Sequence, residues 1–335
     1  MPSLPRTVLI GLVLVGAILA AGCTRQKRPA NPTGTPALRK VVLQTDWFPQ
    51  AEHGGYYQAL VKGFYEQAGL DVEILPGGPG AGIKLKVATG DADFGMYRSD
   101  DVLMAAAAGL PLIMVSATMQ RDPQALMVHA SSPVKTFKDL DGRTIIASVS
   151  MTWIPYMKKK FGINFELRPN TYGLGEFLAN PEAIQQCLVT NEPFFAEQHG
   201  RRVRTLQLAG TGYDSYQVIM CRRELVREAP DVVRAFVHAS IRGWRDYLEG
   251  EPGRADAMIL QRNENMTAGM LKFSRDEMIL RRLVHGDPAK GERIGHLSLA
   301  RITAQMQQLL ELKVLSAPVA ISSVATTQFI PATTP

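Results

Sequence analysis

Cysteine, metal-ligand patterns and long apolar runs are all scarce in this sequence. Its 335 residues include three cysteines, Cys23, Cys187 and Cys221, and six histidines without a spacing such as H-E-x-x-H. A disulfide framework and a zinc-hydrolase motif are therefore excluded. No G-x-S-x-G nucleophile elbow is present, and no apolar run after residue 20 approaches the roughly 18 residues of a membrane helix. The sequence shows no catalytic set, no metal site and no cofactor motif.

Positive charge is in mild excess, with 37 Lys and Arg against 31 Asp and Glu. The basic residues are spread along the chain, which is not the clustered pattern of a nucleic-acid-binding face. An apolar content of 46% is enough for two domains with cores of their own. Cys187 and Cys221 could pair in an oxidising compartment, but we favour two buried free thiols.

Residues 1–22 are predicted to be a signal peptide. Arg6 precedes an apolar run at 7–20 that is too short to span a bilayer comfortably. The run ends in Ala20-Ala21-Gly22-Cys23, which resembles a lipobox, so Cys23 is the expected lipidation site. The alternative is a plain cleaved signal with a chance cysteine. Residues 23–39 are Pro-, Thr- and Lys/Arg-containing and predict a lipid-anchored linker outside the cytoplasm.

The stretch 41–75 predicts a strand, a loop, a helix and a second strand. Pro49 ends the first strand because it cannot donate to a ladder. Apolar and aromatic residues then recur at helical spacing from His53 until Gly69. In a βαβ unit, the loop after the first strand lies at the carboxyl end of the sheet, where α/β proteins hold ligands. Trp47, Phe48 and His53 are on or next to this loop and are candidate ligand contacts.

The same stretch carries a family resemblance. Three motifs, Asp46-Trp47-x-Pro49-x-x-x-His53-Gly54, Lys62-Gly63-Phe64-Tyr65 and Ala68-Gly69-Leu70-Asp71-Val72, resemble the start of type II solute-binding proteins of ABC importers. The sequence is most similar to the branch that binds the pyrimidine precursor of thiamine, within a group that includes nitrate-, sulfonate- and taurine-binding proteins. Gln50 stands where that branch is expected to have Asn.

This resemblance implies an α/β, two-lobed type II periplasmic-binding-protein fold with a double-crossover hinge. Residues 40–128 and 220–317 are expected to form the first lobe, 129–219 the second, and 318–335 a flexible tail. The strands expected at 124–129 and 214–222 would carry the two crossovers. The Gly-rich segment 76–80 predicts a βα turn in preference to a phosphate cradle, because it lacks a GK[ST] ending. A helix is expected at 181–186 and a strand at 187–190.

Further candidate ligand residues follow predicted strands in both lobes. Tyr97, Arg98 and Ser99 follow a buried strand of the first lobe, where Ser99 either caps the next helix or contacts the ligand. Glu192 opens a helix of the second lobe, where it either caps that helix or accepts from an exocyclic amine or ring N–H. Glu192 favours a pyrimidine and Arg98 favours an anion, so a phosphate-bearing or acylated pyrimidine would satisfy both. The predicted ligand-binding residues are Trp47, Phe48, His53, Tyr56, Tyr97, Arg98, Ser99, Ser148, Ser150, Tyr172, Asn191 and Glu192.

The predicted function is capture of an aminopyrimidine outside the cytoplasm and its delivery to an ABC permease with its ATPase. The protein is expected to be a monomer held at the membrane through Cys23, with no cofactor and no nucleic-acid partner. A sulfonate, taurine or nitrate carrier, a flavin carrier and a sensor lobe remain alternatives. A pyrimidine-precursor synthase of this fold would need a cysteine-rich run and a cofactor lysine; Lys62 lies in a motif that binding proteins also have, and no cysteine cluster exists.

Overall fold

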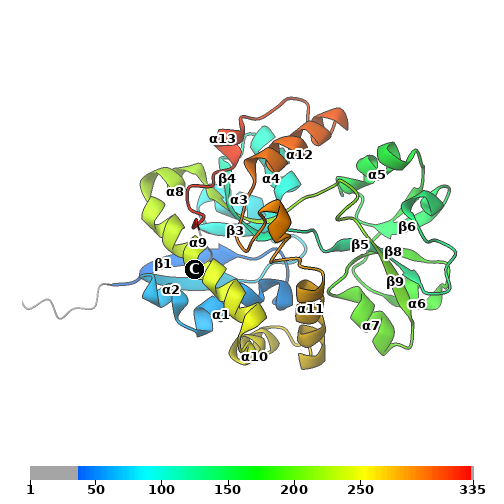
Figure 1. Ribbon diagram of the computed structural model, residues 1–335, viewed down its shortest axis with the longest axis horizontal. Helices are drawn as coiled ribbons and strands as arrows, with labels where there is room; N and C mark the ends of the chain where they lie inside the picture. Colours follow the sequence, from blue (N-terminus) through cyan, green and yellow to red (C-terminus); the bar gives the residue numbers. More distant parts are fainter. Residues whose placement is uncertain (1–36, 333–335) are drawn as a thin grey trace, which may run out of the picture. The chain divides into compact units, whose positions relative to one another are not determined.

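Two mixed sheets of five strands each organise residues 37–332, which are the residues that the computed structural model describes (Figure 1). The predicted signal peptide, Cys23 and the linker as far as residue 36 lie outside the described residues, as do residues 333–335. The segment Ala37–Pro335 is a compact unit of its own. The first sheet has the strand order β2-β1-β3-β10-β4 and the second β7-β6-β8-β5-β9.

The first sheet is parallel at one side and antiparallel at the other. Strand β1 pairs in parallel with β2 and β3, whereas β10 runs antiparallel to β3 and β4. Every residue of β4 is buried, as expected for a continuous apolar strand with both faces covered. The strands are β1 (Arg39–Gln44), β2 (Leu70–Leu75), β3 (Phe94–Arg98), β4 (Leu112–Met119) and β10 (Gln217–Arg222).

The second sheet is built from the middle of the chain. Its strands are β5 (Gln124–His129), β6 (Thr144–Ala147), β7 (Glu166–Pro169), β8 (Ile184–Leu188) and β9 (Val203–Gln207). The prediction assigned residues 124–128 to the first lobe, but β5 pairs with β8 on one side and β9 on the other. The chain therefore passes to the second sheet before β5, through residues 120–123, and returns through residues 208–216.

Helices cover the sheets, and most of the C-terminal third packs with the first one (Figure 1). The N-terminal elements are η1 (Ala51–His53), α1 (Gly54–Val61), α2 (Phe64–Gln67), α3 (Ile83–Thr89) and α4 (Ser99–Ala107). The middle ones are η2 (Phe137–Leu140), α5 (Trp153–Phe161), α6 (Gly175–Ala179) and α7 (Glu192–Gln198). The last ones are α8 (Arg223–Glu228), α9 (Pro230–Glu249), α10 (Gly253–Arg262), α11 (Ala268–Leu280), η3 (Pro288–Lys290), α12 (Leu299–Glu311) and α13 (Ile321–Val324).

Two local predictions are wrong. The helix expected at 181–186 is instead a turn followed by β8, and the Asn180 side chain accepts a hydrogen bond from the Glu182 N–H at 3.0 Å in that turn. The expected flexible tail packs on the fold as far as residue 332. Val324 and Phe329 are fully buried, and Thr326 N–H donates to the Met114 carbonyl of β4 at 3.0 Å. Burial of these apolar side chains in the core therefore holds this low-charge segment against the fold.

Glycines allow α1 and α9 to cross at backbone distance. A Cβ on Gly243 of α9 would lie 2.2 Å from the Gly55 carbonyl oxygen, and a Cβ on Gly55 would lie 2.2 Å from the Trp244 ring. Gly54 meets the Tyr247 ring in the same way, at 2.2 Å. The His-Gly-Gly sequence after the Trp47 loop is thus explained by helix packing that fixes the loop above α9.

Gly243→Ala is expected to lower the free energy of unfolding by about 1–3 kcal/mol, because the new methyl overlaps backbone atoms that cannot rotate away. This is a net loss, since alanine by itself favours a helix interior by about 1 kcal/mol over glycine. Chemical denaturation measures it. Gly253→Ala is the control, because a Cβ there meets nothing within 4 Å. Equal stability of the two variants would contradict this account of the crossing.

Candidate functional site

Aromatic rings from the ends of both sheets meet at one place. Trp47 follows β1 and Tyr172 follows β7, and their ring centroids lie 5.1 Å apart at an interplanar angle of 51°. Phe48 lies edge-on to Trp47 at 5.7 Å. Phe48 is 47% exposed and Tyr172 is 60% exposed, so these rings offer apolar surface to solvent. Residues that follow strands of different sheets thus bring their rings into contact.

Tyr172 adopts a backbone conformation that side chains other than glycine rarely take. Its φ is +63°, in the left-handed region, and the Asn170 side chain accepts its N–H at 2.8 Å. A bulky residue there costs about 1–2 kcal/mol. Such strain concentrates at ligand-binding positions, where the placement of the side chain matters more than local stability.

The Gly-rich turn after β2 supports the Trp47 loop. Gly77 N–H donates to the Trp47 carbonyl at 2.9 Å, and a Cβ on Gly77 would lie 2.3 Å from the Thr45 carbonyl oxygen. The predicted βα turn at 76–80 therefore has a definite task. The absence of a side chain at Gly77 lets the backbone after β2 lie against the backbone after β1. This contact helps to fix the position of the Trp47 backbone.

Polar side chains join the two sheets beside the rings. The hydroxyl of Thr190, which follows β8, donates to the carboxylate of Glu52 in η1. Asn191 Nδ2 donates to Gln50 Oε1 at 3.5 Å. We call these two segments, 46–53 from the first sheet and 190–192 from the second, together with Tyr172, the intersheet interface. Asn191 thus lies against the Trp47 loop, and its contact with a ligand stays a prediction.

Glu52 is a member of this interface that the sequence analysis missed. Its carboxyl group is buried, which raises its pKa, and the Thr190 hydroxyl partly offsets that rise. The sequence feature that could have indicated Glu52 is its position directly before His53 in the loop motif. Its partner is 138 residues away, so the sequence contained no local indication of the contact.

Glu192 lies next to Asn191 as the first residue of α7. Its Oε2 accepts the Leu188 N–H at 2.7 Å, which fixes the carboxyl group at the end of β8. Burial raises the pKa of Glu192 to about 7, and the charge of Glu52 adds to the rise. One oxygen of Glu192 is therefore already bound to backbone, and its contact with a ligand stays a prediction.

Three predicted ligand residues are instead structural. His53 is fully buried and its Nε2 lies 2.8 Å from Asp46 Oδ1, so it holds the start of the Trp47 loop. Tyr56 is buried against Trp244 at a centroid distance of 5.7 Å, and its hydroxyl bonds to Thr118. Burial raises the pKa of Tyr56.

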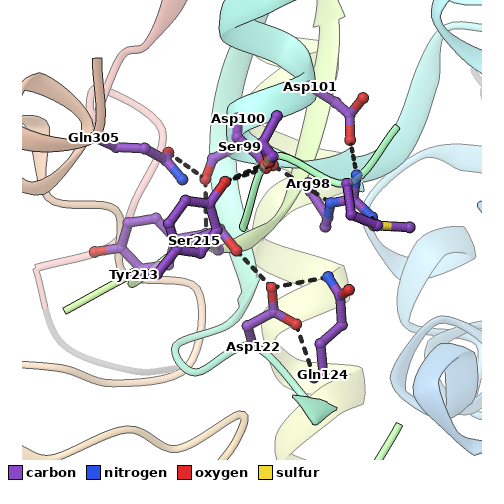
Figure 2. Close-up of polar contacts among 12 residues, drawn as sticks. Arg98, Ser99, Asp100, Asp101, Asp122, Gln124, Tyr213, Ser215 and Gln305 are labelled. Atoms are coloured by element: carbon purple, nitrogen blue, oxygen red, sulfur yellow. Dashed lines mark hydrogen bonds and ion pairs between the residues drawn. The ribbon is translucent and has the colours of Figure 1, made fainter. Parts of the chain in front are cut away.

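Ser99 is the third of these (Figure 2). Its hydroxyl donates to Gln305 Oε1 at 2.7 Å and accepts the Tyr216 N–H at 2.9 Å. It is the first residue of α4, with Arg98 at the N-cap, so it is not the predicted cap, and its side chain is fully buried. It instead ties α4 to α12 and to the segment before β10.

Arg98 is at the centre of a charged network that crosses between the sheets (Figure 2). Its Nε lies 3.4 Å from Asp100 Oδ1, its Nη2 pairs with Asp101, and its Nη1 lies 3.2 Å from the Met151 sulfur. Two carboxylates therefore take up its charge. This corrects the argument that Arg98 favours an anionic ligand.

Asp100 and Asp122 tie the crossing segments to the sheets (Figure 2). Asp100 Oδ2 accepts from the Tyr213 hydroxyl at 2.6 Å and from the Thr152 hydroxyl. Burial raises the pKa of Asp100, but the charge of Arg98 and these donors outweigh it and hold the pKa below its ordinary value. Asp122 accepts from Ser215 Oγ at 2.5 Å, which joins the two crossings, and burial raises its pKa.

The remaining predicted residues lie near strand ends. Tyr97 is half-buried, with Lys84 Nζ 4.9 Å from its ring centroid. The Ser148 and Ser150 hydroxyls lie 3.2 Å apart after β6, and Ser148 N–H donates to Gln186 at 2.9 Å. These positions stay predictions as ligand contacts.

A metal-binding cluster and a membrane-spanning helix are both absent from residues 37–332. That part of the chain contains no group of His, Cys, Asp or Glu arranged to hold a metal ion. It likewise contains no helix long and apolar enough to cross a membrane. Cys187 and Cys221 are buried free thiols, as favoured from the sequence.

Comparison with known proteins gives one family match and several relatives. The family model described as NMT1/THI5 like matches residues 50–255. The chain is 25% identical to the riboflavin-binding protein RibY of Chloroflexus aurantiacus, with 97% of this chain and 98% of the relative covered. It is 23% identical to a formylaminopyrimidine-binding protein of Halalkalibacterium halodurans, with 68% and 72% covered.

Enzymes and solved structures are also among the similar proteins. A 4-amino-5-hydroxymethyl-2-methylpyrimidine phosphate synthase of Saccharomyces cerevisiae, THI11, is 21% identical, with 64% of this chain and 72% of the relative covered. The periplasmic sulfonate-binding protein SsuA of Methylobacillus flagellatus superposes with a TM-score of 0.64 at 14% identity, with 88% of this chain and 93% of that chain covered. At that identity the structural match shows the fold alone, which is the predicted periplasmic-binding-protein fold.

Proposed function

The chain belongs to the NMT1/THI5-like family, and from that premise we propose that it is an extracytoplasmic solute-binding protein for a flat nitrogen heterocycle. The observation that carries this proposal is the contact between Trp47 and Tyr172, whose rings lie 5.1 Å apart at the ends of strands in different sheets. Stacking of a flat ring on such side chains stabilises the complex by about 0.5–1.5 kcal/mol for each aromatic pair, in addition to the contribution of the buried apolar area.

The charge of the intersheet interface defines the ligand further. Asp46, Glu52 and Glu192 are acidic, and His53 is the basic partner of Asp46 there. Arg98 is already paired with two aspartates. A buried carboxyl group is stabilised by an N–H donor and destabilised by an anion. The interface therefore favours a ligand with N–H donors over sulfonate, taurine or nitrate.

An aminopyrimidine of the thiamine-precursor type is the first candidate. Its exocyclic amine donates to a carboxylate while its ring stacks on Trp47. The relative from Halalkalibacterium halodurans, whose name specifies formylaminopyrimidine, supports this choice. A flavin is the second candidate, because the relative named for riboflavin matches nearly the whole chain. Both ligands share a flat pyrimidine ring with N–H donors.

Native mass spectrometry of the purified mature protein tests the proposal directly. A retained small molecule should add a mass that corresponds to a pyrimidine or to a flavin, and a flavin also absorbs visible light. Titration calorimetry with an aminopyrimidine, riboflavin and an alkanesulfonate then ranks the three classes. Binding of the sulfonate alone would overturn the heterocycle assignment and leave the fold intact.

Delivery to a membrane permease completes the proposed function. The chain crosses twice between the sheets, and a double crossing permits the sheets to close on a ligand as rigid bodies about a hinge. Lipidated Cys23 would keep the protein at the membrane face, where an ABC permease with its ATPase receives the ligand. A sensor that reports ligand to a receptor would bind as tightly but support no uptake, so ligand uptake by cells with and without the protein separates the two.

A synthase is the less favoured alternative. Such enzymes are among the relatives, but this sequence has no cysteine-rich run. Lys62, the lysine of the family-like motif, lies 3.4 Å from Asp246 of α9. That pairing holds its amine against α9, so we propose a packing role for Lys62.

Glu192→Gln is expected to weaken binding of an amine-bearing pyrimidine by about 1–3 kcal/mol, because an amide accepts less strongly than a buried carboxylate. Titration calorimetry measures the change. Glu197→Gln is the control, since Glu197 is exposed on the same helix. Unchanged affinity in Glu192→Gln would reject ligand contact at this residue.

The same variant should change the pH dependence of stability. The pKa of Glu192 is raised from an ordinary value of 4.5 to about 7, so the folded protein retains this proton more strongly than the unfolded chain. Its contribution to stability is complete below pH 4.5 and is lost as the pH rises through about 7. Thermal unfolding should therefore show a smaller decline between these pH values in Glu192→Gln.

A further inference from the structure

A basic hollow lies between α2 and α9. Its volume is about 430 Å³, and its polar lining includes Gln67, Asp231, Arg234, His238 and Arg242. Arg234, His238 and Arg242 recur every four residues of α9, so they form one row along the helix. The intersheet interface lies at other elements, and the proposed heterocycle site does not use this row.

Both arginines of the row are held in place by neutral groups. The Arg242 guanidinium lies 3.7 Å from the Phe64 ring centroid, and its Nη1 donates to Gln67 Oε1 at 2.8 Å. Arg234 Nη1 donates to the Gln328 carbonyl at 3.1 Å. Within the described residues neither arginine forms an ion pair with a carboxylate, in contrast to Arg98. Each guanidinium therefore has neutral hydrogen-bond partners, and Asp231 is the acidic residue in the lining of the hollow.

The hollow adjoins the point where β1 begins. Ala68 lines it, and the next residue, Gly69, accepts the Arg39 N–H at 2.9 Å. The chain before β1 is the segment that leads to Cys23, and it carries further basic residues at 25, 27 and 28. The segment that carries Cys23 is therefore joined in sequence to the folded unit at a residue beside this hollow.

We propose that the hollow binds the phosphate of an anionic membrane lipid and so orients the protein on the membrane surface. Planar guanidinium groups donate paired hydrogen bonds to phosphate oxygens. Stacking of Arg242 on Phe64 reduces the entropy that such binding would otherwise cost. Asp231 at the rim opposes the anion, so the two arginines and His238 must outweigh it. This proposal goes beyond the heterocycle site and rests only on attachment at the membrane face.

His238 gives the site a pH dependence. Burial lowers the pKa of His238, and the charge of Arg234 lowers it further, while the Phe329 carbonyl raises it. The charged groups that face it from α9 are Asp231, Arg234 and Arg242, and Gln67 of α2 is neutral. A bound phosphate would favour the imidazolium form. Lipid binding should therefore strengthen as the pH falls through the pKa of His238.

Vesicle co-flotation of a chain that begins at Ala37 tests the proposal, because this compact unit lacks the acyl anchor. The vesicles contain phosphatidylglycerol and phosphatidylcholine at about 3:7. The double variant Arg234→Gln/Arg242→Gln should lower the partition coefficient by about 25-fold, since each basic residue near an anionic surface contributes about fivefold. The matched control is Arg201→Gln/Arg202→Gln, two exposed arginines before β9, which should change it by less than threefold.

Each other outcome decides against the proposal. Equal losses in the two double variants would mean attraction by net charge alone, and no loss in either would mean that the hollow does not contact lipid. Inorganic phosphate is titrated separately while the His238 imidazole is followed by NMR; tight phosphate binding without vesicle binding would assign the site to a free anion. Arg234→Gln/Arg242→Gln should keep full heterocycle affinity, so failure here is distinct from failure of the proposed function.

Discussion

Trp47→Ala is expected to weaken heterocycle binding by about 100-fold, because the change removes both stacking and most of the apolar area that covers the ligand ring. Trp47 is half-buried and its ring contacts Phe48 and Tyr172, which are themselves exposed. Unfolding stability should therefore change little. Titration calorimetry with the ligand identified by mass spectrometry gives the affinity, and denaturant unfolding gives the stability.

Tyr172→Gly is the companion variant that separates stacking from folding. It removes the second ring and also relieves the positive φ of this residue. We expect weaker binding together with equal or higher stability. If Trp47→Ala and Tyr172→Gly both bind the ligand as tightly as the parent protein, the aromatic contact is not the site.

The Trp47 loop could be predicted because its information is local. Pro49, the helical spacing after His53 and the glycines of the next turn each fix a backbone feature within a few residues. The parallel order of β1 and β2 then follows from the βαβ arrangement, and it is observed. That the loop faces Tyr172 and Asn191 also follows, since ligand-binding loops gather at the carboxyl ends of strands.

Roles that depend on distant partners could not be read from the sequence. Ser99 follows a strand in the manner of a ligand contact, yet Gln305, 206 residues away, takes its hydroxyl. Arg98 seemed available for an anion until the fold placed Asp100 and Asp101 against it. Tyr56 has the spacing of a helix face, and only the position of α9 decides that this face is buried.

In two segments, tertiary contacts determine the structure against the local sequence preference. Residues 184–188 have no strong preference for a strand. They nevertheless form β8, which lies between β5 and β6 and pairs with both of them. Residues 318–332 have the composition of a tail, and Phe329 is nevertheless fully buried. In both cases the deciding contacts are made with elements far along the chain.

Asp100→Ala is expected to lower the free energy of unfolding by about 3–5 kcal/mol, the usual cost of removing one partner from a buried ion pair. The change leaves the Arg98 guanidinium with Asp101 as its remaining carboxylate. It also deprives the Tyr213 and Thr152 hydroxyls of their acceptor. Because Asp100 follows a strand of the first sheet and Thr152 precedes α5 of the second, the loss should also weaken the contact between the two sheets.

Acid unfolding distinguishes this account from a simple loss of packing. The pKa of Asp100 lies below its ordinary value of 3.8, so its contribution to stability is present above pH 3.8 and is lost as the pH falls through the lower folded value. Asp100→Ala should therefore lose that part of the acid transition. Tyr213→Phe, which removes a single donor, should cost only about 1 kcal/mol, and Glu264→Ala at an exposed loop position should cost less. If Asp100→Ala is no less stable than Tyr213→Phe, the Asp100 carboxylate does not hold α4 against Thr152 and the second crossing.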